Sequence, residues 1–131
     1  HKEPALQAGV SSLAGKVALA DGKPVDAALN FDKQAVFLQR AALWADMAYA
    51  LQQAGEAYGQ AFQADAATLR FYRAARSYYA QGMLVPALQA VELAVQSSSK
   101  TTDEVLAADT GRLLEEIKRQ VGVAQTAVGA E

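Results

Sequence analysis

Three arginines recur at every third position among aromatic residues. Arg70, Arg73 and Arg76 stand in the segment LRFYRAARSYYA, together with Tyr72 and Tyr79. Guanidinium groups bind carboxylates through two parallel hydrogen bonds and stack on aromatic faces, so this combination is suited to holding a peptide. A solvated helix face with partly buried tyrosines explains the same pattern without any ligand. The pattern leaves both interpretations open.

Residues that would support catalysis or metal binding are few. His1 is the only histidine, and a histidine at one end of the chain cannot anchor a catalytic triad or a histidine-rich metal site. The absence of cysteine excludes disulfides, thiol catalysis and cysteine-ligated metals. Glu115 and Glu116 are adjacent, so on a helix they point about 100° apart. We therefore expect a protein that is not an enzyme and that uses no cofactor and no metal.

Composition favours a single all-α domain. The chain has 131 residues and is 52% hydrophobic, and much of that share is alanine, the strongest helix former. The net charge of -2 argues against nucleic acid or an anionic membrane as partner. No apolar run reaches the length of a membrane span, so we expect no membrane insertion. The alanine bias suggests a GC-rich bacterial genome, and the location stays open between cytoplasm and periplasm.

Hydrophobic periodicity predicts helices along most of the chain. Between residues 25 and 53 the pattern fits either one long helix or two. Asp65 is a candidate N-cap for a helix through Tyr79, Gly82 ends that helix, and Pro86 begins the next. The first helix precedes the break DGKP, and its apolar stripe consists of Leu6, Val10, Leu13 and Val17.

The last predicted helix follows the polar stretch SSSKTTDE, in which Thr102 or Asp103 is the N-cap. Its opposite face is charged, so we expect it to cap the C-terminal end of a helical array. Trp44 is the sole tryptophan, and we expect it to pack against the N-terminal helix. If it is exposed, it would anchor a protein interface. The apolar stripe of the last helix is Leu106, Leu113, Ile117 and Val121.

Two stretches of the chain match at a constant offset of 33 residues. Small residues such as Ala75, Ala87 and Ala94 would let two antiparallel helices approach closely, while Gly82 provides backbone freedom for a turn. Tyr49 stands where the second stretch has Gly82. The matched pairs are Leu38 with Phe71, Ala42 with Ala75, Ala45 with Tyr78, Ala54 with Ala87, Tyr58 with Val91 and Ala61 with Ala94.

The second stretch resembles a tetratricopeptide repeat (TPR), a helix-turn-helix unit of about 34 residues. The residues that carry the resemblance are Phe71, Ala74, Ala75, Tyr78, Gly82, Ala87, Val91 and Ala94. It implies a right-handed array of five to six antiparallel helices in one domain. That domain would comprise an N-terminal segment (1–34), a degenerate repeat (35–67), a second repeat (68–101) and a capping helix with a tail (102–131). An ordinary alanine-rich helical bundle is the alternative.

The TPR resemblance also implies a binding surface, because in that family the first helix of each repeat lines a concave groove. Some members grip a carboxylate there with a lysine and an asparagine, and this chain lacks that pair at the matching positions. The residues expected to bind a partner are Leu69, Tyr72, Arg76 and Tyr79 in the second repeat, Gln39, Leu43 and Asp46 in the first, and Arg73 from the arginine pattern.

These features favour a non-enzymatic adaptor, scaffold or assembly factor that binds a protein or peptide. One alternative is a structural oligomer subunit or a secretion-type chaperone. Two repeats are few for a stable solenoid, and a second copy or a client would supply the missing surface. Another alternative is a helical bundle that binds a small ligand near Tyr58, Phe62 and Tyr78.

Overall fold

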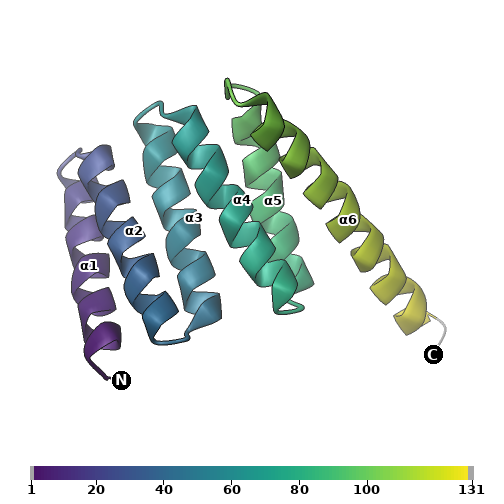
Figure 1. Ribbon diagram of the computed structural model, residues 1–131, viewed down its shortest axis with the longest axis horizontal. Helices are drawn as coiled ribbons and strands as arrows, with labels where there is room; N and C mark the ends of the chain where they lie inside the picture. Colours follow the sequence, from purple (N-terminus) through teal and green to yellow (C-terminus); the bar gives the residue numbers. More distant parts are fainter. Residues whose placement is uncertain (1, 130–131) are drawn as a thin grey trace.

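A row of six helices makes up the computed structural model, which describes residues 2–129 and leaves His1 outside. Each helix packs mainly against the next one in the sequence (Figure 1), so the array is open. The all-α prediction is confirmed, and residues 25 to 53 contain two helices. The helices are α1 (Lys2–Ala20), α2 (Pro24–Arg40), α3 (Trp44–Gln60), α4 (Ala64–Ala80), α5 (Leu84–Ser98) and α6 (Glu104–Gly129).

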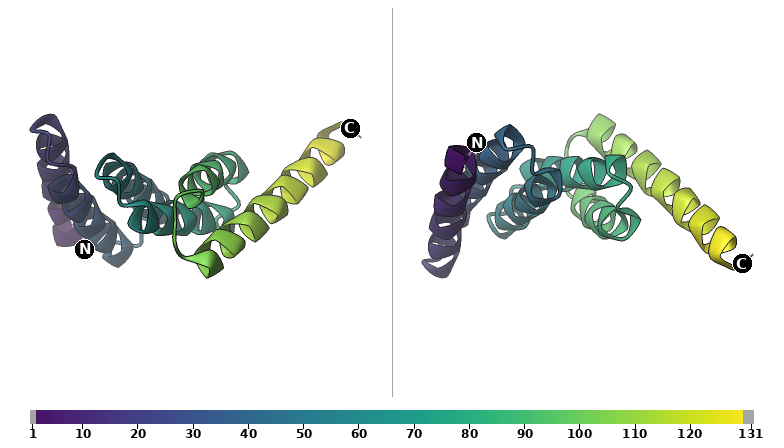
Figure 2. Two further views of the ribbon diagram at one scale, coloured as in Figure 1. Left: turned by 90° about the horizontal axis from the view of Figure 1, so that it is seen from above. Right: turned by 90° about the horizontal axis from the view of Figure 1, so that it is seen from below.

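The helices do not stay parallel along the row. Figure 2 shows the array from above and below, and the α1–α2 pair at one end slants in the opposite direction to α6 at the other. Such a progressive rotation is typical of helical repeats, which stack as solenoids. No helix in the described part of the chain is both long and apolar enough to span a membrane.

Four turns of the same form join the first five helices. Their central residues, Gly22, Ala42, Phe62 and Gly82, have φ angles of 71°, 56°, 60° and 74° and lie twenty residues apart. In each turn the next N–H donates to the carbonyl five residues back; the bond from Met83 to Tyr78, for example, is 3.0 Å long. This is the Schellman motif. The helix boundaries therefore recur every 20 residues, and a hairpin of two helices takes 40.

The 40-residue spacing corrects the offset of 33 that the sequence suggested. Tyr49, which matches Gly82 at that offset, lies inside α3. The turn lies earlier, where Ala42 adopts a positive φ of 56°. An alanine there pays a steric penalty that glycine avoids, so the sequence contains no breaker that marks this turn. Gly82, by contrast, occupies the predicted left-handed position.

Aromatic rings seated over glycines hold two of the hairpins together. A Cβ atom added to Gly15 of α1 would lie 2.6 Å from the ring of Phe31 in α2. Forty residues later, a Cβ on Gly55 of α3 would lie 2.8 Å from the ring of Phe71 in α4. Both rings are buried. The same pair of residue types thus makes the same contact in the α1–α2 and α3–α4 hairpins.

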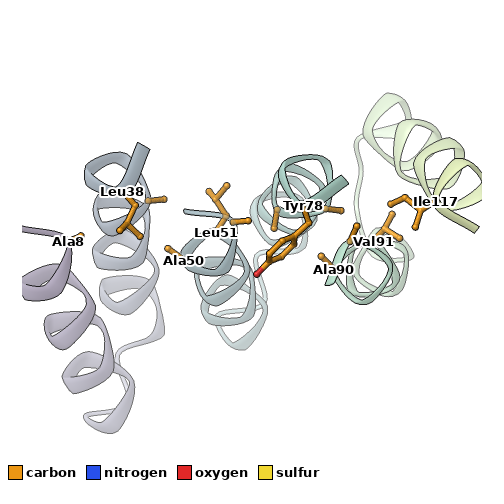
Figure 3. Packing of buried hydrophobic residues seen from close by; sticks show 13 residues of the cluster. Ala8, Leu38, Ala50, Leu51, Tyr78, Ala90, Val91 and Ile117 are labelled. Carbon is orange, nitrogen blue, oxygen red and sulfur yellow. The ribbon is translucent and has the colours of Figure 1, made fainter. Parts of the chain in front are cut away.

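The buried residues form two clusters that run across the helices. The first draws on all six helices and includes Leu51, Val91 and Ile117 (Figure 3). The second surrounds Phe31 and Phe71. Alanines occupy most of the remaining buried positions, and Ala75, Ala87 and Ala94 are fully buried, as predicted for closely packed helices.

Polar contacts fix the start of α6. The N-cap is Asp103, whose Oδ1 accepts a hydrogen bond from the Leu106 N–H at 2.9 Å. The carboxylate of Asp65 accepts bonds from the N–H and the hydroxyl of Thr102, both at 2.9 Å, and from the hydroxyl of Thr101. The prediction that Asp65 caps α4 is wrong, because α4 begins at Ala64. Asp65 instead ties the first turn of α4 to the connection before α6.

The apolar stripe of α1 faces away from the array. Its four residues, Leu6, Val10, Leu13 and Val17, are between 52% and 71% exposed. The other face of α1 packs on α2 through small residues, among them Ala8, Ser11, Gly15 and Ala18. Close approach to α2 requires those small residues, so the larger ones are left on the outside. The stripe of α6 behaves as predicted, because Leu106 and Ile117 are buried.

The ring-over-glycine contact predicts that Gly55→Ala is destabilising. The new methyl group would overlap the Phe71 ring, and overpacking of this kind lowers the free energy of unfolding by about 1–3 kcal/mol. Gly111→Ala in α6 is the matched control, because no atom lies within 4 Å of its added Cβ. There the better helix propensity of alanine should raise stability by roughly 0.5–1 kcal/mol. Urea denaturation measures both changes, and equal effects would contradict the contact.

The hydrogen bonds from Thr101 and Thr102 lower the pKa of the Asp65 carboxyl. A carboxyl whose folded pKa is lowered adds stability above its unfolded pKa of about 3.9, and this stability is lost as the pH falls through the folded value. Asp65→Asn should therefore lower the urea midpoint at neutral pH, with a difference from the parent that shrinks below about pH 4. Asp26→Asn, in the first turn of α2, is the control and should show a smaller change.

Candidate functional site: a groove along α2, α4 and α6

Two hollows open beside α4, and Arg76 lines both. The first lies where α2, α3 and α4 meet; its lining residues are Gln39, Trp44, Met47, Leu51, Arg73, Arg76 and Ser77. The second lies between α4 and α6 and has a volume of about 600 Å³; its lining residues are Tyr72, Arg76, Tyr79, Ala80, Asp109, Arg112, Leu113 and Glu116. We call the two hollows together the Arg76 groove.

The sequence of α4 places its polar residues in this groove. Phe71, Ala75 and Tyr78 are buried against the neighbouring helices. Because these residues follow the helical period, Tyr72 and Arg76, which lie between them, point to the other side. The exposed face of α4 thus presents aromatic and cationic side chains, and the buried face positions the helix.

Arg70 has a structural role. Its Nε and Nη2 atoms donate to Oδ1 and Oδ2 of Asp32 in α2, at 3.3 and 3.1 Å. The hydroxyl of Tyr58 in α3 donates to the same carboxylate at 3.1 Å, and the Arg70 guanidinium lies 4.8 Å from the centre of the Tyr58 ring. Burial, and then the charge of Asp32, raise the pKa of Tyr58 and keep it a donor. The three side chains therefore tie α2, α3 and α4 together.

Arg73 and Arg76 differ from the other arginines of α4 and α6. Arg112 pairs with Asp109 and Arg119 with Glu116, the latter at 3.7 Å. Within residues 2–129, neither Arg73 nor Arg76 has a carboxylate oxygen within 4.0 Å. The guanidinium of Arg76 lies 5.7 Å from the centre of the Tyr72 ring. The groove thus holds two cations that have no anionic partner in the described chain.

Tyr79 adds a hydrogen-bond donor to the groove. Partial burial, followed by the nearby charge of Glu116, raises the pKa of its phenol. The side chain therefore stays protonated at neutral pH and can donate to an acceptor on a bound molecule.

The structure brings five of the expected binding residues together and leaves three apart. Gln39, Tyr72, Arg73, Arg76 and Tyr79 all line the Arg76 groove. Leu69, Leu43 and Asp46 are exposed but belong to neither of its hollows. Leu43 ends the turn before α3, and Asp46 lies in the first turn of that helix. Their displacement follows from the 40-residue spacing, which moves the turn away from Tyr49.

Several groove residues escaped the sequence analysis. Trp44 was expected to pack against the N-terminal helix, and this prediction is wrong. It is the first residue of α3, is 47% exposed, and lines the same hollow as Arg73. Arg112 and Glu116 were read as part of the solvated outer face of the last helix, but both line the groove. Their helical spacing gave no signal, because it does not reveal how α6 tilts against α4.

The residues proposed for a small-ligand pocket do not converge. Tyr58 and Tyr78 belong to the two different buried clusters. Phe62 is 93% exposed and occupies the centre of the α3–α4 turn with a positive φ of 60°. The bundle alternative therefore has no pocket at the place where the sequence suggested one.

The chemistry of the groove is that of recognition. No group of three potential metal-binding side chains gathers among the residues that the structure describes. Arg76, Tyr72 and Trp44 offer charge, stacking surface and hydrogen bonds to another molecule. A comparison of the chain with protein-family models and with curated proteins finds no match.

The different environments of the α4 arginines give a matched pair of variants. Arg70→Ala breaks the contacts with Asp32 and Tyr58, and it should lower the free energy of unfolding by about 1 kcal/mol. Arg73→Ala removes the same side chain from the same helix without breaking an ion pair. It should change stability by less than about 0.5 kcal/mol. Chemical denaturation monitored by Trp44 fluorescence measures both, and equal losses would contradict the structural role of Arg70.

Proposed function

We propose that the chain is a non-enzymatic interaction module, an adaptor or assembly factor, that holds a segment of a partner protein in the Arg76 groove. The observation that carries this proposal is the pair of arginines without an anionic partner, Arg73 and Arg76, beside exposed aromatic rings. Three other arginines on the same two helices are paired with carboxylates. An unpaired pair in a groove is therefore the local exception, and a partner's carboxylate would complete it.

The lining of the groove defines the chemistry of the segment. An aspartate or glutamate would lie at Arg73 and Arg76, where each guanidinium offers two donors. An apolar or aromatic residue would lie on one side of it against Trp44 and Met47. On the other side, Tyr79 would donate to a polar group of the segment. We therefore propose an extended or helical segment in which an acidic residue stands next to an apolar one.

A TPR-like, right-handed arrangement is part of the proposal. The residues that resemble a TPR, from Phe71 to Ala94, fall on α4 and α5, and Gly82 forms the turn between these helices. The unit of 40 residues is longer than the TPR period of about 34. The resemblance is accordingly proposed for the α4–α5 hairpin, and its extension along the chain is a helical repeat with its own spacing.

Selection of random peptides displayed on phage, followed by fluorescence polarisation with the enriched sequences, tests the proposal. We expect enrichment of segments with an acidic residue beside an aromatic or aliphatic one. Arg76→Ala should weaken binding at least about tenfold, because a charge-assisted hydrogen bond contributes about 1.5–3 kcal/mol. Arg73→Glu with Arg76→Glu should shift the preference to basic segments.

The control for this test is Arg40→Ala. Arg40 is exposed at the end of α2 and stacks on Phe37 at 5.8 Å, and it lines neither hollow of the groove. Its loss should leave the affinity unchanged within about twofold. Acidic peptides that bind Arg76→Ala as tightly as the parent chain would refute the proposed function.

A further inference from the structure

The outward stripe of α1 is the largest apolar feature that the groove does not use. Leu6, Val10, Leu13 and Val17 lie on one face of the helix, opposite its contact with α2. No charged residue occurs between residues 4 and 15, although 20% of the whole chain is charged. A helix face without charges that exposes four aliphatic side chains is atypical of a surface in contact with water.

The two ends of the array differ in this respect. The exposed side of α6 carries Arg112, Glu115, Glu116, Lys118 and Arg119. Repeat arrays need a polar outer face on their terminal helices to stay soluble, and α6 meets this requirement. The opposite end, at α1 (Figure 1), lacks it. A terminal helix of this composition indicates that another surface covers it.

The stripe is complementary to itself. The intervals from Leu6 to Val17 are four, three and four residues, so the spacing reads the same from either end. When two copies of α1 lie antiparallel about a two-fold axis, Leu6 meets Val17 of the second copy, and Val10 meets Leu13. Every contact then joins one leucine to one valine, and no charged side chain lies near the axis. An interface in which a surface meets its own copy is the commonest arrangement in protein dimers.

We propose that the chain forms a symmetric homodimer through antiparallel packing of the α1 stripes. Covering the four side chains on both copies removes on the order of 1,000 Å² from water, the lower bound of a specific interface. The helix dipoles of the antiparallel pair are also opposed, which is favourable. The interface lies on α1, away from the Arg76 groove, so the dimer presents two grooves and gains avidity for a partner with two segments. The proposal does not depend on what the groove binds.

Charge substitutions at the stripe test the pairing by sedimentation equilibrium. The parent chain should sediment as a dimer, and Val10→Glu alone or Leu13→Lys alone should give a monomer. The double variant Val10→Glu with Leu13→Lys should recover the dimer, because each glutamate then meets a lysine of the second copy. A parallel pair would place like charges together and stay monomeric. A monomeric parent, a dimeric Val10→Glu chain or a monomeric double variant would each overturn the proposal.

Engineered cysteines test the same register without introducing charge, and the chain has no cysteine of its own. A mixture of Val10→Cys and Leu13→Cys chains should oxidise mainly to the mixed disulfide. Predominant linkage of Val10→Cys to itself would contradict the antiparallel pairing. The Tyr72, Arg76 and Tyr79 triple alanine variant should remain dimeric, which separates this interface from the groove.

Discussion

The packing of a phenylalanine ring against a bare glycine backbone sets the geometry of the array. Phe31 over Gly15 and Phe71 over Gly55 bring the axes of α1 and α2, and of α3 and α4, close enough for alanines to fill the rest of the interface. A side chain on either glycine would occupy the place of the ring. Because both contacts recur after 40 residues, they indicate that the two hairpins are copies of one unit, although few other residues match between them.

The groove is a consequence of this packing. Close contact within each hairpin leaves the outer residues of α4 uncovered between α2 and α6, and the bridge of Asp32, Tyr58 and Arg70 holds α2 and α4 at a fixed distance. The hydrogen bonds of Asp65 with the connection before α6 set the position of the other wall. One arginine of α4 therefore stabilises the fold, and two others are left for a ligand, although all three have the same spacing in the sequence.

Helix content, the Gly82 turn, the Asp103 cap and the buried alanines could be predicted from the sequence, because each depends on local propensity or spacing. The turn at Ala42 could not, since an alanine in a left-handed conformation carries no local signal. The exposed stripe of α1 was equally hidden, because periodicity identifies an apolar face but not the direction in which it points. Trp44 joined the groove for the related reason that its neighbours come from α4, thirty residues away.

The repeated contact between phenylalanine and glycine is the central claim, and nuclear Overhauser measurements on a sample labelled at these two residue types test it directly. Of the nine glycines, Gly15 and Gly55 should have α-protons shifted upfield by ring currents. They should also show cross-peaks to the rings of Phe31 and Phe71 respectively. Unshifted α-protons at both positions, or ring contacts at Gly9 and Gly59 instead, would contradict the 40-residue unit on which the account of the groove rests.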